Sequence, residues 1–270
     1  MRQSGRRGGG PSGSGGVMVV QMTPVVKILL IANIATWLGV VHILPFLMSH
    51  LATSIEWAGA VTRSSIFQWV GLVPYSTVFE FKLWQPLTYL FLHSPDLTHI
   101  LFNMLLLWWV GSQIERTMGT KQFLRYYFVC GIGAGLLYLV SAFFMNFVLG
   151  MGQDVMTMPV VGASGAIFGL LLAFAIFHGE EVVYFMMIFP MRAKYFVAIL
   201  ALIEVFMITT LGVSGPVANL AHLGGFIVGF AYLWFQTYLK RRAKRRWFRK
   251  NGRNLRLVVD NEKKSKTTYH

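Results

Sequence analysis

Four polar residues in apolar stretches of the sequence could together carry out acyl transfer. His99 and Asn103 lie in "HILFN", Ser164 lies in "PVVGASGAIFG", and His222 lies in "ANLAHLGGF". A serine hydroxyl is a weak nucleophile until a base accepts its proton, and a neutral histidine suits that role. Attack on a carbonyl creates an oxyanion, which the Asn103 amide, the His99 ring N–H and free backbone N–H groups at a helix start could stabilise. The residue types therefore indicate a serine hydrolase built on Ser164 and His222.

The composition places these residues in a membrane. Of the 270 residues, 55% are hydrophobic and 13% are charged, whereas a typical globular chain has about 25% charged residues. The apolar residues form long blocks, and about 20 apolar residues suffice for one helical span. The sequence predicts an all-α polytopic membrane protein with one membrane domain over residues 24–239. A disordered, basic, Gly/Ser-rich segment is expected over 1–23 and a basic tail over 240–270.

Six apolar stretches are candidates for transmembrane helices. Between the first and second, an aromatic-rich connection is expected to form short helices at the membrane interface. Between the fourth and fifth, residues 182–194 are too short to span and are expected to form a loop that is partly interfacial. The predicted spans are residues 28–48, 97–114, 123–147, 162–177, 195–211 and 217–238.

The charge distribution predicts the orientation. The termini, the connections after spans two and four and the first turn of span three carry 22 of the 24 Lys and Arg residues. The positive-inside rule places both termini in the cytoplasm, and the layout is typical of a cell inner membrane. A basic tail next to a span favours contact with anionic lipid, so we expect no nucleic-acid partner despite the net charge of +14.

Cofactor chemistry has no sequence support. The single cysteine cannot form an internal disulfide, and Cys/His metal-binding patterns are absent. We therefore expect neither a metal nor another cofactor.

The orientation brings the four polar residues to one depth. Spans two, four and six run from the outer side inward, and each carries its polar residues in its first turns. With a rise of 1.5 Å per residue, His222 lies about 8 Å past the start of span six. His99, Asn103, Ser164 and His222 are therefore expected to meet near the outer side.

Glycines predict close contact between spans four and six. Gly165 and Gly169 form a small-xxx-small pair, as do Gly225 and Gly229. Such pairs let helix backbones approach in lipid, which would bring Ser164 within reach of His222.

Structural roles compete with catalytic ones. Ser164 alone could be a helix-packing residue, and Asn103 could bond between helices. Glu204 is ambiguous, with a hydrogen bond inside the bundle favoured over catalysis, so the sequence predicts a Ser–His dyad. Glu115 is expected to fix the turn after span two. His42 and His178 have no predicted partners and are taken as structural.

The motifs resemble the rhomboid family of intramembrane serine proteases over residues 25–240. The matching pieces are "HILFN", "WWVGSQIERTMG", "GASG" and "AHLGGFIVG", in this order. The resemblance implies a six-helix bundle with a cavity open to the outer face. It implies Ser164 as nucleophile and His222 as base, with His99, Asn103 and the Ser164 N–H holding the oxyanion. It also implies cleavage of membrane proteins within or beside their transmembrane helices.

Two residues depart from the family pattern. Trp84-Gln85 stands where rhomboids often have Trp-Arg, which leaves no ion pair for that position. Phe168 stands where tyrosine is frequent and would pack under the His222 ring.

Two other functions compete with proteolysis. A rhomboid-like pseudoprotease that binds client helices usually lacks the serine or the histidine, and both are present here. A transporter would be favoured by inverted repeats, and none is evident. For a protease, substrate helices with helix-breaking or small residues near the outer face are expected to be preferred.

Overall fold

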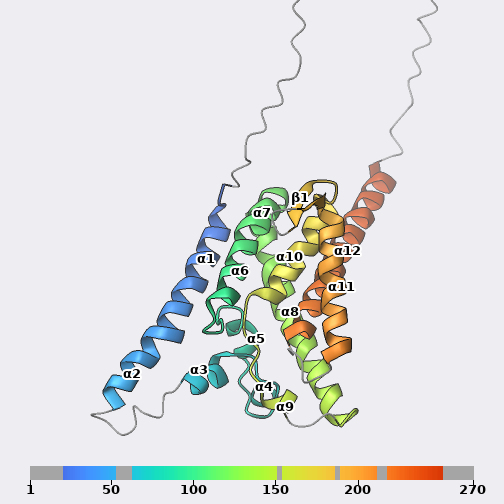
Figure 1. The fold of residues 1–270 in the computed structure, drawn as a ribbon. Coiled ribbons are helices and arrows are strands. Elements are labelled where there is room, and N and C mark those ends of the chain that lie inside the picture. Colours follow the sequence, from blue (N-terminus) through green and yellow to red (C-terminus); the bar gives the residue numbers. More distant parts are fainter. Residues whose placement is uncertain (1–20, 53–62, 151–153, 186–188, 212–217, 252–270) are drawn as a thin grey trace, which may run out of the picture.

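Helices make up most of the computed structural model, which describes residues 21–52, 63–150, 154–185, 189–211 and 218–251 (Figure 1). Four helices in these ranges are long and apolar enough to cross a membrane, and α10 (Ser164–Phe177) is a shorter apolar helix. Each overlaps a predicted span. The four long helices are Pro24–His50, Leu97–Met118, Thr120–Phe147 and Ala193–Thr210.

The first long helix is anchored at one end by a buried glutamate. It comprises α1 (Pro24–Thr36), the π-helical η1 (Trp37–Ile43) and α2 (Leu44–Ala52). The Glu115 carboxylate accepts the first backbone N–H groups of α1, from Val25 and Val26, and the Thr23 hydroxyl. A carboxylate at a helix N-terminus satisfies unpaired N–H groups and complements the helix dipole. Glu115 thus ties α1 to the second long helix, while α2 diverges from the other helices (Figure 1).

Three short helices follow, as predicted for the aromatic-rich connection: α3 (Arg63–Val70), α4 (Pro74–Phe79) and α5 (Gln85–Thr88). The fully buried Gln85 holds them together. Its carbonyl accepts the Val73 N–H and the Thr77 hydroxyl, and its amide donates to the Gln68 carbonyl. The buried carbonyl and amide of Gln85 thus both have hydrogen-bond partners, and no charged residue is needed at this position.

Three helices form the centre of the bundle: α8 (Thr120–Phe147), α10 and α12 (Ala218–Asn251). The second long helix packs beside them and comprises α6 (Leu97–Leu106), the π-helical η3 (Leu107–Gly111) and α7 (Ser112–Met118). α10 is apolar on all sides, as expected for a helix surrounded by others. Nine of its 14 residues are buried: Gly165, Ala166, Ile167, Phe168, Gly169, Leu170, Leu171, Ala173 and Phe174.

The chain is mostly helical, as predicted, but the loop predicted after α10 contains a short hairpin. Residues 182–194, expected to form a loop, contain the antiparallel strands β1 (Val182–Phe185) and β2 (Phe189–Arg192), which lead into α11 (Ala193–Leu211). β1 consists of valines and aromatic residues, which favour strands. Pro190, opposite Tyr184, is tolerated because both strands of a two-stranded sheet are edges. The predicted loop after α8 also contains a short helix, α9 (Asp154–Thr157).

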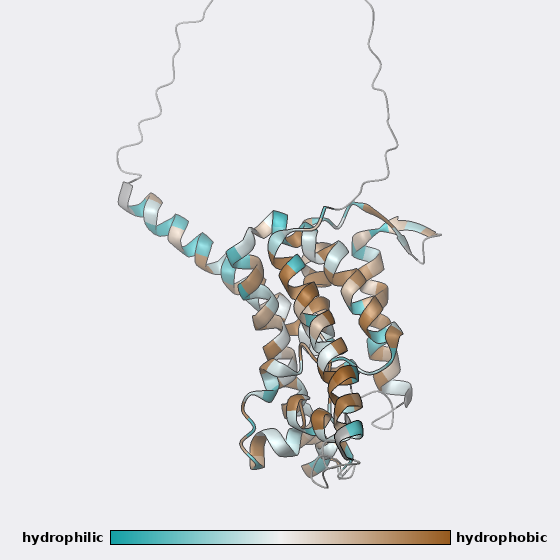
Figure 2. Ribbon diagram, turned by 90° about the vertical axis from the view of Figure 1, so that its left-hand side faces the viewer, coloured by the Kyte–Doolittle hydropathy of each residue, from teal (hydrophilic) through white to brown (hydrophobic). Residues whose placement is uncertain are grey.

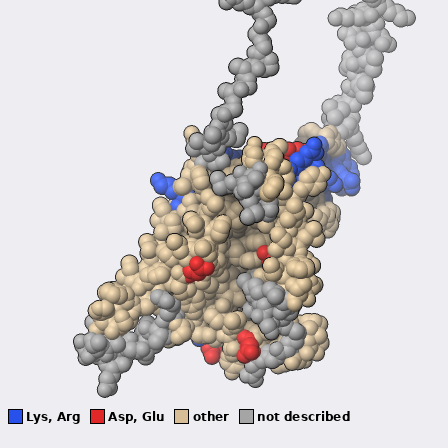
Figure 3. Space-filling view, viewed as in Figure 1, with Lys and Arg blue, Asp and Glu red and all other residues tan. Residues whose placement is uncertain are grey.

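Basic residues gather at one end of the bundle. Figure 3 shows a flank nearly free of Lys and Arg, which cluster at the end where α7 and β1 lie. The end of α12 that leaves the bundle in Figure 1 is hydrophilic in Figure 2, because residues 240–250 contain eight Lys and Arg. The described part of the predicted basic tail is therefore a continuation of α12.

Candidate active site

Ser164 is the first residue of α10, and the segment before it is fixed by the first connection. Val160 and Leu72 exchange two backbone hydrogen bonds of 2.9 Å, and the Gly162 N–H donates to the Tyr89 carbonyl at 2.9 Å. This single β-bridge is the extent of strand pairing before Ser164 in the described residues. Gly162 has φ +124°, a conformation that side-chain-bearing residues rarely adopt. The serine is thus presented at a helix N-terminus, where backbone N–H groups are free.

His222 lies in the first turns of α12 and faces Ser164. Its Nε2 is 2.8 Å from the Ser164 hydroxyl, within hydrogen-bond distance. Phe168 stacks on the imidazole, with ring centroids 4.4 Å apart and planes 7° apart. Phe226 packs edge-on against Phe168 at 5.1 Å. The His222 ring is therefore contacted at Nε2 by Ser164 and on one face by Phe168.

The glycine pairs let α10 and α12 touch at the backbone. A Cβ added at Gly225 would lie 2.0 Å from the Gly165 carbonyl oxygen, and one at Gly229 would lie 3.3 Å from the Gly169 Cα. No side chain fits in that space, because heavy atoms do not approach so closely. The Ser164–His222 contact depends on this close crossing.

His99 points one ring nitrogen toward the serine. Its Nδ1 accepts the Ser94 backbone N–H at 3.3 Å and lies 2.9 Å from the Ser94 hydroxyl. A neutral imidazole that accepts at Nδ1 carries its proton on Nε2. A Cβ added at Gly162 would lie 3.0 Å from His99 Nε2 and 3.6 Å from Ser164 Oγ. The two groups therefore flank one small space, which remains open because residue 162 is glycine.

Asn103 lies one turn after His99 in α6 and is buried. Its side-chain amide donates to the His99 carbonyl at 2.8 Å. Among the described residues it has no hydrogen bond to Ser164 or His222. Its second N–H is not used in that bond and could serve a ligand.

Sequence reasoning missed one neighbour of this site, Ser94, and did not identify the partner of another, Glu204. Ser94, five residues before His99, received no role, although a hydroxyl near a candidate histidine is a signal for a tautomer-fixing partner. Glu204 in α11 does form a hydrogen bond inside the bundle, and its partner is His222, with Oε1 3.1 Å from Nδ1. A lone carboxylate in an apolar helix was the available signal, but its partner depends on how α11 packs.

Two titratable groups just before α6 have shifted pKa values. Burial lowers the pKa of His93 to about 4, and nearby His99 adds to the effect, so His93 is neutral near pH 7. Hydrogen bonds from the Thr98 hydroxyl and backbone N–H lower the pKa of Asp96, which caps α6. At neutral pH, His93 is therefore uncharged and Asp96 is ionised in the turn before His99.

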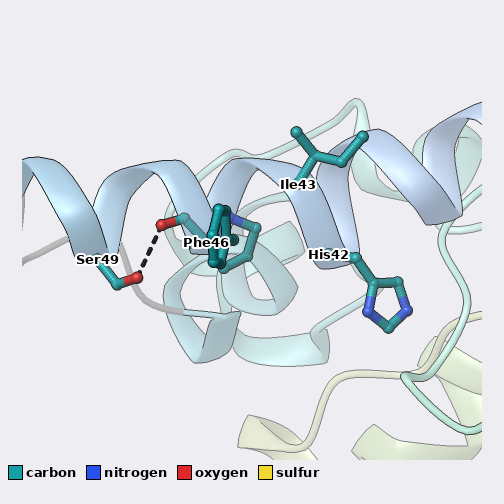
Figure 4. A pocket seen from close by; sticks show the side chains of 5 residues that line it. His42, Ile43, Phe46 and Ser49 are labelled. Carbon is teal, nitrogen blue, oxygen red and sulfur yellow. Dashed lines mark hydrogen bonds between the residues drawn. The ribbon is translucent and has the colours of Figure 1, made fainter.

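His42 and His178 contact residues outside this site. His42 packs edge-on against Trp37 and lines a hollow with Ile43, Pro45, Phe46 and Ser49, all from one helix (Figure 4). His178 has two partners that the sequence did not identify: it contacts Glu181 at 2.6 Å and the Thr117 hydroxyl at 2.8 Å. Within the described ranges, no three His, Cys, Asp or Glu residues are grouped to hold a metal ion.

Comparisons with known proteins agree with the motifs. The family model for the rhomboid domain matches residues 80–239. The chain is 35% identical over 144 residues to rhomboid protease AarA of Providencia stuartii, covering 51% of this chain and 50% of that protein. It is 33% identical over 150 residues to RHOMBOID-like protein 1 of Arabidopsis thaliana, covering 55% and 33%. It is 28% identical over 156 residues to rhomboid protease GlpG of Yersinia pseudotuberculosis, covering 58% and 49%. The chain thus spans half or less of the length of these relatives.

Proposed function

Because the chain belongs to the rhomboid family and is a multi-pass membrane protein, we propose that it is an intramembrane serine endopeptidase with Ser164 as nucleophile and His222 as general base. The 2.8 Å hydrogen bond between Ser164 Oγ and His222 Nε2 carries this proposal. A nucleophile and base within such reach are the geometric signature of covalent catalysis. The names of the bacterial relatives, rhomboid proteases AarA and GlpG, support the same activity.

The reaction proceeds in two halves. His222 Nε2 accepts the hydroxyl proton as Ser164 Oγ attacks the scissile carbonyl, and the imidazolium returns that proton to the leaving amine. An acyl-enzyme remains on Ser164. Water then attacks the ester with His222 again as base, and the carboxylate product leaves.

The space beside Gly162 is the proposed oxyanion hole. The Nε2–H of His99 lines it, and the unpaired Ser164 backbone N–H at the start of α10 is the second proposed donor. Asn103 contributes the amide hydrogen that it does not donate to the His99 carbonyl. Donors fixed before the reaction stabilise the developing charge without reorganisation.

The proposed membrane arrangement has six spans. α10 and the apolar first part of α12, to about residue 239, join the four long helices. Residues 1–23 and the basic segment from 240 lie in the cytoplasm of a cell inner membrane. The basic end of the bundle supports this orientation under the positive-inside rule. Ser164 and His222 then open toward the outer side.

The proposed substrates are membrane proteins cleaved in or beside a transmembrane helix. An intact helix hides its carbonyls, because each accepts a backbone hydrogen bond. An extended segment must therefore reach Ser164, and small or helix-breaking residues near the outer face would favour cleavage. A set of substrate helices that differ only at such residues should be cleaved at different rates, and equal rates would contradict this preference.

A fluorophosphonate probe tests the function directly. The protein, purified in mild detergent, should be labelled, while S164A and H222A should not. Among the described residues, Ser141 on α8 bonds only to its own helix through the Leu137 carbonyl, so S141A is a matched control that should label like the parent. The same four proteins should be compared for cleavage of a model transmembrane substrate.

The alternative function is a pseudoprotease that binds client helices. Retention of both residues, 2.8 Å apart, disfavours it. A folded parent that neither labels nor cleaves, but still binds the substrate helix, would favour this alternative.

A further inference from the structure

Both ring nitrogens of His222 have partners. Nε2 contacts the Ser164 hydroxyl at 2.8 Å, and Nδ1 contacts the Glu204 carboxylate at 3.1 Å. The three side chains come from three helices, α10, α12 and α11. They form a line in which a carboxylate, an imidazole and a hydroxyl follow one another.

In the described part of the protein, His222 is the only hydrogen-bond partner of the Glu204 side chain. Its Oε1 contacts His222, and its Oε2 is buried without a hydrogen-bond partner among the described residues. The Glu204 and His222 side chains are only 13% and 18% exposed. An ionisable residue in an apolar helix is costly, which makes a functional role the default interpretation.

We propose, on the basis of the protease function proposed above, that Glu204 is a positioning residue that completes a Ser164–His222–Glu204 triad. Nδ1–H donates to the carboxylate, which fixes the tautomer that leaves Nε2 free to accept the serine proton. When His222 becomes an imidazolium during acylation, the carboxylate next to it stabilises the charge. Serine hydrolases with a carboxylate in this place gain from both effects.

The stack on Phe168 cannot provide this orientation alone. A flat ring contact, 4.4 Å between centroids, fixes the plane of the imidazole. It distinguishes poorly between the two ring orientations related by a half-turn about χ2, because both keep the imidazole plane parallel to the phenyl ring and differ only in which face is stacked on it. The hydrogen bond to Glu204 selects the orientation that presents Nε2 to Ser164.

A purely structural role makes a different prediction. The Glu204–His222 bond also links α11 to α12, and α11 is otherwise largely exposed in the described protein. If it served only as a link, its loss would lower stability and change substrate affinity. If it positions His222, its loss would lower the rate of the chemical step.

The test compares E204Q, E204A and E204D with the parent in detergent. The readouts are kcat and KM for a model transmembrane substrate, the rate constant for fluorophosphonate labelling, and the melting temperature. Glutamine keeps the shape and an acceptor oxygen but lacks the charge. In the part of the chain that the structure describes, Thr209 on the same helix bonds only to α11 carbonyls, so T209V is the matched control.

We expect E204Q to lower kcat and the labelling rate by about 10- to 100-fold, with KM and melting temperature near those of the parent. E204A should lose more, and E204D, which retains the charge, should recover part of the rate. The proposal is overturned if E204Q keeps kcat within about twofold, or if kcat falls only together with a lower melting temperature and a higher KM. An active parent silenced by S164A but unaffected by E204Q would overturn only the triad. An inactive parent would overturn the protease function and the triad together.

Discussion

Gly162 lies directly against the imidazole of His99. A Cβ at this position would come within 3.0 Å of Nε2, and the Gly162 backbone has φ +124°. The glycine is therefore required twice, once for the turn that presents Ser164 and once for the space beside its hydroxyl.

Gly162→Ala should abolish most activity. The methyl group would occupy the proposed oxyanion hole, so we expect kcat to fall by at least about 100-fold, as when an oxyanion donor is removed. Gly150→Ala is the control, because Gly150 also has a positive φ, +64°, but nothing lies within 4 Å of its added Cβ. Equal losses of kcat in the two variants would show that backbone strain, and not the filled space, is the cause.

Much of the site followed from sequence because its residues lie at the starts of apolar helices. The starts of α6, α10 and α12, the glycine pairs and the short helices of the first connection were all readable from periodicity and residue type. The second long helix was predicted to begin at residue 97, and α6 begins at Leu97. Depth along a span depends only on the rise per residue, so residues at equal depth could be grouped.

Contacts between side chains of neighbouring helices could not be predicted in this way. Which residue of α11 faces His222 depends on the rotation and crossing of α11 against α12, which a helix with apolar residues on every side does not reveal. Ser94 was missed because its partner atom depends on a turn conformation. The hairpin before α11 was missed because its two strands are too short to show a clear alternation.

Phe168 should hold the His222 ring by its face. Phe168→Leu keeps an apolar side chain but removes the stack, so kcat should fall about 3- to 10-fold, in line with the strength of an aromatic pair. Phe168→Tyr retains the ring and should keep kcat within about threefold of the parent. Steady-state cleavage by the three proteins, with melting temperatures as a check on folding, measures this. A leucine variant as active as the parent would show that the stack does not orient the histidine.

His99 and Ser94 should give graded losses. His99→Ala removes an oxyanion donor and should lower kcat by about 10²- to 10³-fold with little change in KM. Ser94→Ala removes the hydroxyl 2.9 Å from Nδ1 but keeps the backbone N–H that donates to it, so the loss should be about tenfold or less. Single-turnover cleavage measures both variants. A larger loss for Ser94→Ala than for His99→Ala would contradict the assignment of His99 as the donor.

Gly225 should be intolerant of any side chain. The Cβ of Gly225→Ala would lie 2.0 Å from the Gly165 carbonyl, so α10 and α12 must separate. We expect a lower melting temperature, from overpacking of about 1–3 kcal/mol, and loss of activity as Ser164 and His222 move apart. Gly39→Ala is the control, because nothing lies within 4 Å of its Cβ and alanine favours helix. Parent-like activity in Gly225→Ala would show that the site tolerates a wider crossing.

His93 should make stability depend on pH. Its pKa in the folded protein is about 4, below the ordinary 6.5, so the unfolded chain binds a proton first as the pH falls. The stabilisation is complete above about pH 6.5 and is lost progressively down to about pH 4. Between pH 7 and pH 5 the loss is about 2 kcal/mol, from 1.36 kcal/mol per pH unit. The variant His93→Phe has no such group, so its melting temperature should fall less than that of the parent over this interval. Parallel curves for the two proteins would show that His93 is not kept neutral by burial.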